Sequence, residues 1–248
     1  MSWTRVNEMQ LMGGIRRCVR NRGILRRVWS RVTNVSRTTQ SDAVPVGDVY
    51  YGDCAENYIT RRLQKDYWHL EQDVVEKLVN ELPEGVRILD VPFGTGRFVP
   101  FYRRKNLDVY GLDASADMIR IAEQELREDF ANCTISVGDA ADLPYEDGFF
   151  HVIVCFRFLS HIVSLTDARR ILSELTRVCR RELLLQFRVR HDDAPAAPWP
   201  AEDEAMSDRL NQRQITEILR LAGLRIRKTV DLEQREVYGR SVFVCEKS

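Results

Sequence analysis

The sequence predicts an α/β fold: a doubly wound, mostly parallel sheet with helices packed around it. From residue 86 onward, short apolar runs with β-patterning alternate with segments of helical period. Such alternation implies parallel strands joined by right-handed crossovers. The first of these runs lies in RILDVPFGTGRF, residues 87–98, and leads into a turn that contains Gly94 and Gly96. An apolar run bounded by glycine is typical of a buried strand that feeds a helix, and glycine lets the backbone approach a ligand closely.

The individual elements follow from the hydrophobic period. Strands are expected at residues 86–91, 107–112, 133–137, 149–156 and 182–188, with helices at 96–105, 115–128 and 167–179. A further helix at 211–222 ends at Gly223, a plausible C-cap. Two final strands, 224–232 and 237–246, are expected to pair antiparallel. The proline-rich segment 189–208 contains Trp199 and breaks this rhythm, so it is expected to form a loop or lid.

The part of the chain before the first strand divides into an arm, a linker and a helix. Residues 38–49 are polar and turn-rich, which indicates a linker. We therefore expect a basic N-terminal arm and linker at 1–49 and one domain at 50–248. A long helix is expected over about residues 55–82, because apolar side chains form one stripe and Pro83 and Gly85 end the pattern. The expected stripe comprises Leu63, Tyr67, Leu70, Val74 and Leu78.

The net charge of zero hides an asymmetry between the arm and the domain. Residues 1–41 contain nine arginines and one acid, Glu8, so they carry +8 and the remainder carries −8. One interpretation is adhesion of a broken amphipathic segment to an anionic membrane surface or a polyanion. Another is a frayed arm, or a helix packed on the acidic domain. A third is a mitochondrial transit peptide, which is also rich in arginine and poor in acids.

Composition excludes several classes of protein. No apolar run approaches the roughly 20 residues needed to cross a bilayer, and no continuous apolar stretch indicates a secretory signal. Six cysteines are scattered without a C-x-x-C pair, so we expect reduced packing residues in a cytoplasmic protein and no metal site. They are Cys18, Cys54, Cys133, Cys155, Cys179 and Cys245.

Three carboxylates lie at or just after the ends of the expected strands. Asp113 comes seventeen residues after Gly96, where it can accept both hydroxyls of a ribose. A dinucleotide fingerprint would need glycine three residues beyond Gly96, where this chain has Val99. Asp90 suits instead a ligand with an ammonium group and a sulfonium. Asp139, after the third strand, can accept from an adenine amine, although a turn or N-cap aspartate is the structural alternative.

Together, the stretches LDVPFGTGRF, YGLDASADMIRIAEQ, VGDAADLP and FFHVIVCFRFLSHI resemble the class I S-adenosylmethionine-dependent methyltransferases, particularly the small-molecule group with ubiquinone/menaquinone-type enzymes. Pro92 replaces the first glycine of the family's first motif. The resemblance covers residues 50–246 and implies a Rossmann-like seven-stranded sheet with an antiparallel last strand and an N-terminal cap helix. It implies S-adenosylmethionine as cofactor, contacted by Asp90, Pro92, Gly94, Gly96, Asp113, Ala114, Met118, Asp139, Ala140 and Phe156, and, from the cap segment YYGDCAENYITRR, by Tyr58 and Arg62.

Catalytic candidates come from the histidines and one arginine. His161, in RFLSHI after the fourth strand, is the first candidate for a general base, with capping or packing as the alternative. His69 on the cap helix is a weaker candidate, and His151, inside a strand, is interpreted as structural. Arg157 is a candidate for binding a carboxylate or phosphate of the acceptor, or else forms an ion pair with a neighbouring acid.

The function that these features favour is methyl transfer from S-adenosylmethionine to an oxygen or nitrogen of a small-molecule acceptor. One alternative is a membrane-surface enzyme that acts on a lipid or quinone-like acceptor through residues 1–41. Another is a non-catalytic cofactor-binding or nucleic-acid-associated protein in which the arm contacts phosphates. The acidic domain argues against extended nucleic-acid contact, and neither the acceptor nor the oligomeric state follows from the sequence.

Overall fold

The computed structural model describes residues 66–161, 164–191, 210–235 and 237–248. Several expectations lie outside the described residues. They are the basic arm and linker, the cap helix before residue 66 with Tyr58 and Arg62, and most of the proline-rich segment.

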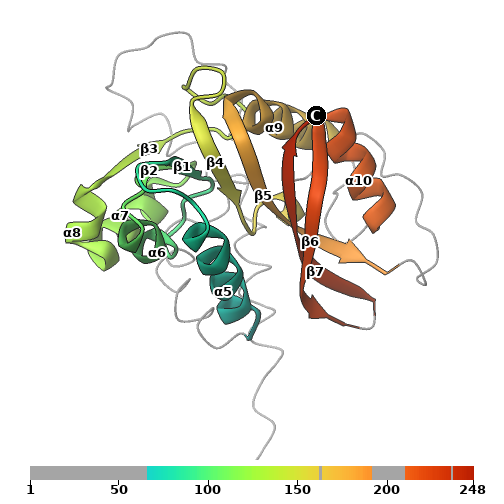
Figure 1. The fold of residues 1–248 in the computed structure, drawn as a ribbon, viewed down its shortest axis with the longest axis horizontal. Coiled ribbons are helices and arrows are strands. Elements are labelled where there is room, and N and C mark those ends of the chain that lie inside the picture. The colour runs from blue at the N-terminus through green and yellow to red at the C-terminus, as the bar shows by residue number, and fades with distance from the viewer. Residues whose placement is uncertain (1–65, 162–163, 192–209, 236) are drawn as a thin grey trace, which may run out of the picture. The chain divides into compact units, whose positions relative to one another are not determined.

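A seven-stranded sheet forms the centre of the described domain, with strand order β3-β2-β1-β4-β5-β7-β6 (Figure 1). Strands β1 to β5 pair in parallel, while β7 runs antiparallel to both β5 and β6. This confirms the predicted doubly wound sheet with its antiparallel last strand. The bounds are β1 Arg87–Asp90, β2 Asp108–Asp113, β3 Cys133–Val137, β4 Phe150–Cys155, β5 Cys179–Arg190, β6 Leu224–Gln234 and β7 Tyr238–Lys247.

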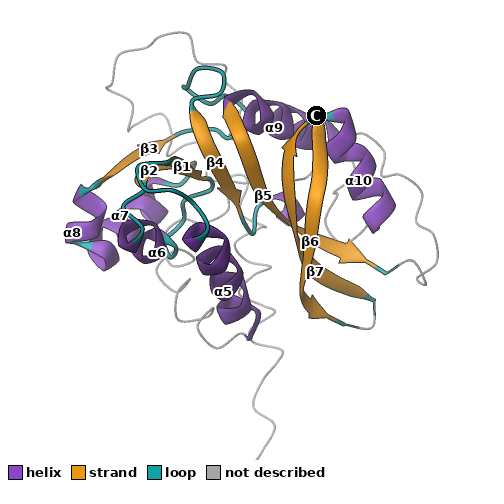
Figure 2. Cartoon of the chain, in the orientation of Figure 1, coloured by secondary structure: helices purple, strands orange, loops and turns teal. Residues whose placement is uncertain are grey.

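Helices cover both faces of the sheet (Figure 2). On one face, α5 (Asp66–Asn80), α6 (Val99–Arg104) and α7 (Ala116–Leu126) contribute buried side chains to a core that includes Val79, Val99 and Ala122. On the other face, α9 (Leu165–Val178) and α10 (Gln212–Leu221) pack Leu172 and Ile215 onto the sheet. The strand order reverses between β1 and β4, and in open α/β sheets ligands bind beside the carboxyl ends of the strands at such a point.

Local signals fix several helix ends. The Ser115 side chain caps α7 by accepting from the backbone N–H of Met118, and Asn211 forms a capping box with Gln214 at the start of α10. Gly223 follows α10 with φ +75°, as expected of the residue after a helix C-cap. The helix expected at 115–128 is instead two helices, because Arg127 adopts φ 49° between α7 and the short α8, Glu128–Ala131.

Two other expectations about helices were wrong in detail. Helix α6 begins at Val99 and not at residue 96, because Gly96 has φ +66°, which is outside the helical region. The most buried side chains of α5 are Tyr67, Trp68, Glu71, Val75 and Val79, and Val74 and Leu78 are partly buried against the same core, whereas Leu70 is 42% exposed. The predicted stripe was therefore wrong at Leu70, because a pattern of apolar residues alone does not reveal that Glu71 is fully buried.

The four described cysteines, Cys133, Cys155, Cys179 and Cys245, are unpaired thiols, and all but Cys133 are buried. Burial raises the pKa of Cys133 to about 11, so this thiol is protonated at neutral pH. Within the described ranges, no group of His, Cys, Asp and Glu side chains is arranged to hold a metal ion. No helix among these residues is long and apolar enough to cross a membrane.

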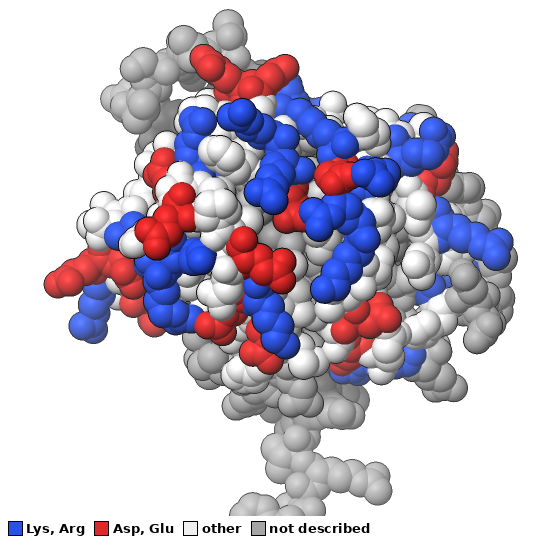
Figure 3. All heavy atoms as spheres, in the orientation of Figure 1, with Lys and Arg blue, Asp and Glu red and all other residues white. Residues whose placement is uncertain are grey.

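The visible surface carries both signs of charge. Figure 3 shows Lys and Arg side chains interspersed with Asp and Glu side chains over the described part of the domain. Lys and Arg side chains gather over the upper middle of this view (Figure 3), with Asp and Glu side chains among and below them.

Candidate functional site

The loop between β1 and α6 is built around two glycines with positive φ. Gly94 has φ +57° and Gly96 has φ +66°, conformations that glycine adopts readily and other residues rarely do. The backbone N–H of Phe93 donates to the carbonyl of Leu112 at 2.9 Å, which fastens the loop to the end of β2. A Cβ on Gly96 would lie 2.5 Å from Leu126 Cδ1 and 2.8 Å from Phe93 Cζ, so the packing beneath the loop also requires glycine.

This packing predicts the effect of alanine at two glycines with similar backbones. Gly85 has φ +70°, and a Cβ added there would meet no heavy atom within 4 Å. Gly85→Ala is therefore expected to lower the free energy of unfolding by about 1 kcal/mol through the backbone alone. Gly96→Ala adds the contacts with Leu126 and Phe93 and is expected to lower it by at least about 1 kcal/mol more. Urea denaturation checks the difference, and equal losses for the two variants would contradict the proposed clash.

Asp113 joins the glycine loop to the start of α7. Its Oδ2 accepts from the backbone N–H of Gly94 at 2.7 Å, and its Oδ1 accepts from the backbone N–H of Ser115 at 2.9 Å. The residue is 7% exposed, and burial raises its pKa while these two backbone hydrogen bonds oppose the rise. A carboxylate can accept about four hydrogen bonds, so Asp113 can fix the loop and still accept from ligand hydroxyls.

Asp90 is a buried carboxyl group at the end of β1. It is 3% exposed and accepts from the Tyr102 hydroxyl at 3.3 Å. Burial raises its pKa well above the ordinary value, and the positive charge of Arg97 opposes this rise. A cationic ligand group beside Asp90 would favour its ionised form. The position is therefore suited to an ammonium group.

Asp139 and Ala140 lie in the turn after β3. Asp139 Oδ1 accepts from the backbone N–H of Ala141 at 2.9 Å, which is the local bond of a turn aspartate. The structural alternative for Asp139 is thus realised, whether or not a ligand also uses this carboxylate. Ala140 is 6% exposed and contributes to the core beneath the turn.

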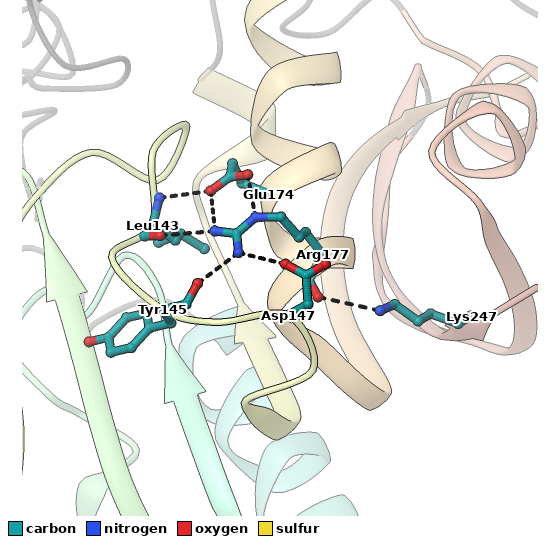
Figure 4. A network of polar contacts seen from close by, with 6 residues as sticks. All are labelled: Leu143, Tyr145, Asp147, Glu174, Arg177 and Lys247. Carbon is teal, nitrogen blue, oxygen red and sulfur yellow. Dashed lines mark hydrogen bonds and ion pairs between the residues drawn. The ribbon is translucent and has the colours of Figure 1, made fainter.

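The segment after this turn is fastened to α9 by a polar network (Figure 4). Arg177 donates to the carbonyl oxygens of Leu143 at 3.0 Å and Tyr145 at 2.7 Å, and to Asp147 Oδ1 at 2.9 Å. Glu174 accepts from the backbone N–H of Leu143 at 2.9 Å. Hydrogen bonds from Arg177 hold the pKa of Glu174 below its ordinary value. The network therefore fixes the loop that begins at Asp139.

The remaining residues assigned to the cofactor line the same region. Pro92 follows a cis peptide bond at Val91. Met118, 2% exposed, has its Cε 3.7 Å from the position of a Cβ on Gly94. Ala114 lies between Asp113 and the capping residue Ser115. Phe156, directly after β4, packs edge-on against Phe98 at 5.4 Å between ring centroids. These contacts bring the ends of β1, β2 and β4 together.

The three histidines considered from the sequence lie in three different elements, a 3-10 helix, α5 and β4. His161 ends a short 3-10 helix, η2 (Leu159–His161), after β4, and its side chain lies outside the described part of the structure. His69 is exposed on α5. At about 100° per helical residue it points roughly 200° away from the buried Glu71. His151 Nδ1 accepts from the backbone N–H of Arg87 at 3.2 Å, which agrees with its structural interpretation.

Arg157 forms an ion pair with an acid, as one of its two interpretations from the sequence expected. Its Nη1 lies 3.9 Å from Glu71 Oε2. Its backbone has φ 59°, unusual for a residue other than glycine, and its N–H donates to Gln186 Oε1 at 2.8 Å. The sequence analysis predicted neither Glu71 nor Gln186 as a partner of Arg157.

Glu71 is the centre of this missed cluster. Its Oε2 accepts from Arg97 Nη2 at 2.5 Å, and its Oε1 accepts from Gln186 Nε2 at 2.5 Å. The Arg97 guanidinium also lies 4.1 Å from the centre of the Trp68 ring. The available signals were a glutamate within the apolar stripe of α5 and a glutamine within the apolar run ELLLQFR.

Comparison with known proteins identifies what this arrangement resembles. Residues 88–182 match the family model described as a methyltransferase domain. Demethylmenaquinone methyltransferase of Thermotoga maritima is 38% identical over 112 residues, which is 44% of this chain and 44% of that protein. The chain covers between 37% and 56% of the lengths of the four curated relatives that it matches.

Solved structures share the fold at low sequence identity. Magnesium protoporphyrin IX methyltransferase from Synechocystis PCC 6803, with bound SAH, superposes with a TM-score of 0.60 and 21% identity, covering 80% of this chain and 97% of that one. The cyclase SpnF superposes with a TM-score of 0.59 and 21% identity, covering 74% of this chain and 85% of that one. The similar architecture thus occurs in proteins named for different reactions.

Proposed function

We propose that this chain, in which residues 88–182 match a methyltransferase domain, is a class I S-adenosylmethionine-dependent methyltransferase that transfers a methyl group to an oxygen or nitrogen of a small-molecule acceptor. The observation that carries the proposal is the Asp113 carboxylate, which fixes the backbone of Gly94 and stands at the end of β2. A buried carboxyl group, Asp90, stands at the end of the neighbouring strand.

The described residues fit the proposed cofactor in three places. Asp113 would accept from the ribose hydroxyls. Asp90 would face the ammonium group, whose positive charge offsets the burial that raises the Asp90 pKa. The loop after Asp139, fixed by Arg177, would hold the adenine. When bound, the cofactor supplies an activated methyl group, so positioning can carry much of the catalysis.

We assign the role of general base to His161. It follows Ser160, whose Oγ accepts from the backbone N–H of Arg188 at 3.0 Å, so this segment is fixed to β5 near its carboxyl end. A base there would accept a proton from the acceptor as the new bond to methyl forms. His161→Ala is expected to lower turnover about 100-fold while the affinity for S-adenosylhomocysteine changes less than twofold. His151→Gln is the matched control, and equal turnover in both variants would leave His161 without a catalytic role.

The proposed activity requires a test that distinguishes it from cofactor binding alone, since a cyclase shares this fold. The full chain would be incubated with methyl-labelled S-adenosylmethionine and a metabolite extract of the source cells. We expect a labelled small molecule to form together with S-adenosylhomocysteine. Calorimetric binding of S-adenosylhomocysteine without any labelled product would favour the non-catalytic alternative.

A further inference from the structure

Three arginines converge near the carboxyl end of β5. Arg188 on β5 is the direct register partner of Arg240 on β7. Side chains alternate between sheet faces, so Arg188 shares a face with Leu184, and Arg240 shares it with Val242, both of the core beneath α5. Like charges placed directly opposite in an antiparallel pair are destabilising. Such a pair therefore requires negative charge nearby, and Glu233 supplies part of it by pairing with Arg240.

Aromatic rings hold these guanidinium groups in place. The Cζ of Arg240 lies 4.1 Å from the centre of the Tyr67 ring on α5, and the Cζ of Arg157 lies 5.4 Å from the same ring. The Cζ of Arg188 lies 4.3 Å from the centre of the Tyr238 ring. The pKa of Arg240 is lowered, mainly by burial, and the charges of Arg188 and Arg157 lower it further. Arg188 and Arg157 are thus both close enough to Arg240 to repel its guanidinium group.

Two acids that pair with these arginines are each shared with a further arginine. Glu71 faces Arg157 and also pairs with Arg97. Glu233 pairs with Arg240 and also with the more exposed Arg235. The side chains of Arg97 and Arg157 are each 11% exposed, and that of Arg240 is 18% exposed. Low exposure makes like charges costly to hold together, and an anionic ligand would lower that cost.

We propose that Arg157, Arg188 and Arg240 bind an anionic group, a carboxylate or a phosphate, of the methyl acceptor. The inference rests on the proposed function. Guanidinium groups present planar forks that match carboxylate and phosphate oxygens. The backbone N–H of Arg188 donates to Ser160 Oγ, one residue before His161. An acceptor anchored at Arg188 would therefore lie beside the segment that carries the proposed base.

The first test needs no variant. The metabolite extract is separated on an anion-exchange resin into a retained and an unretained fraction, and each is incubated with the full chain and methyl-labelled S-adenosylmethionine. We expect the labelled product to arise from the retained fraction. Treating that fraction with alkaline phosphatase then distinguishes the two anions, since a phosphate acceptor would be lost and a carboxylate acceptor would persist. A product formed only from the unretained fraction would overturn the proposal.

The second test changes the charge of the site. Arg188→Gln is expected to lower the rate of labelled product at limiting extract at least tenfold, and Arg188→Lys is expected to recover part of that rate. Arg225→Gln is the matched control, because Arg225 lies exposed on β6 and pairs with Glu246. Equal rates for the Arg188→Gln and Arg225→Gln variants would overturn the proposal.

Measurements of cofactor binding distinguish arginines that bind the acceptor from arginines that bind the cofactor's own carboxylate. Arg188→Gln is expected to leave the affinity for S-adenosylhomocysteine within twofold of the original. If it weakens that ligand but not 5′-methylthioadenosine, which lacks the amino-acid part, the arginines bind the cofactor's own carboxylate and the proposal fails. If no fraction yields a labelled product while S-adenosylhomocysteine binds, the proposed function itself fails.

Discussion

Asp113→Ala will weaken the binding of S-adenosylhomocysteine by about 100-fold or more, which is about 2.8 kcal/mol. The carboxylate accepts from the backbone N–H groups of Gly94 and Ser115, and hydrogen bonds to charged groups contribute about 1.5–3 kcal/mol each. Alanine removes both bonds together with the proposed acceptor for the ribose hydroxyls. Isothermal titration calorimetry of the full chain measures the change.

Two further variants isolate the role of this carboxylate. Asp113→Asn keeps one oxygen that can accept from Gly94 or Ser115, so its affinity is expected to lie between that of the alanine variant and the original. Asp117→Ala removes a carboxylate that is 35% exposed in the first turn of α7 and is expected to change affinity less than twofold. Unaltered binding in the Asp113→Ala variant would remove Asp113 from the cofactor site.

The fold was predictable because its determinants are local in the sequence. Alternating strand and helix periods reflect burial of each element against the same sheet, and they predict parallel strands joined by right-handed crossovers. The seven-stranded sheet with its antiparallel last strand was implied by the family resemblance. The glycine loop was also predictable, because the positive φ angles at Gly94 and Gly96 strongly favour glycine at these two positions. The start of α6 was misplaced because the same Gly96 also excludes the helical conformation.

The buried ionic cluster was not predictable in the same way. Glu71 and Gln186 are 115 residues apart in the chain, and only the folded domain brings their side chains to 2.5 Å. A prediction from hydrophobic period treats glutamate as a surface residue, so it placed Leu70 in the stripe that Glu71 occupies. Likewise, Arg188 and Arg240 become neighbours only through the β5–β7 register. Long-range polar partners carry no periodic signal.

The cluster gives Glu71 a large expected effect on stability. Glu71→Ala is expected to lower the free energy of unfolding by about 3–5 kcal/mol, because removing one partner of a buried ion pair leaves the other charge uncompensated. Arg97, with a side chain 11% exposed, would lose its 2.5 Å contact, and Gln186 would lose its acceptor. At about 2–4 °C per kcal/mol for a protein of this size, the melting temperature would fall by at least about 6 °C.

Glu76→Ala on the same helix is the matched control. Glu76 pairs with Arg104, but the two side chains are 38% and 59% exposed, and exposed pairs contribute at most about 1 kcal/mol. Urea denaturation of the two variants should therefore differ by about 2 kcal/mol or more. Equal losses of unfolding free energy would mean that the protein tolerates removal of the Glu71 carboxylate. The larger loss would show that Glu71 fastens α5 to the glycine loop through Arg97 and to β5 through Gln186, which also fixes the backbone of Arg157 beside the proposed acceptor site.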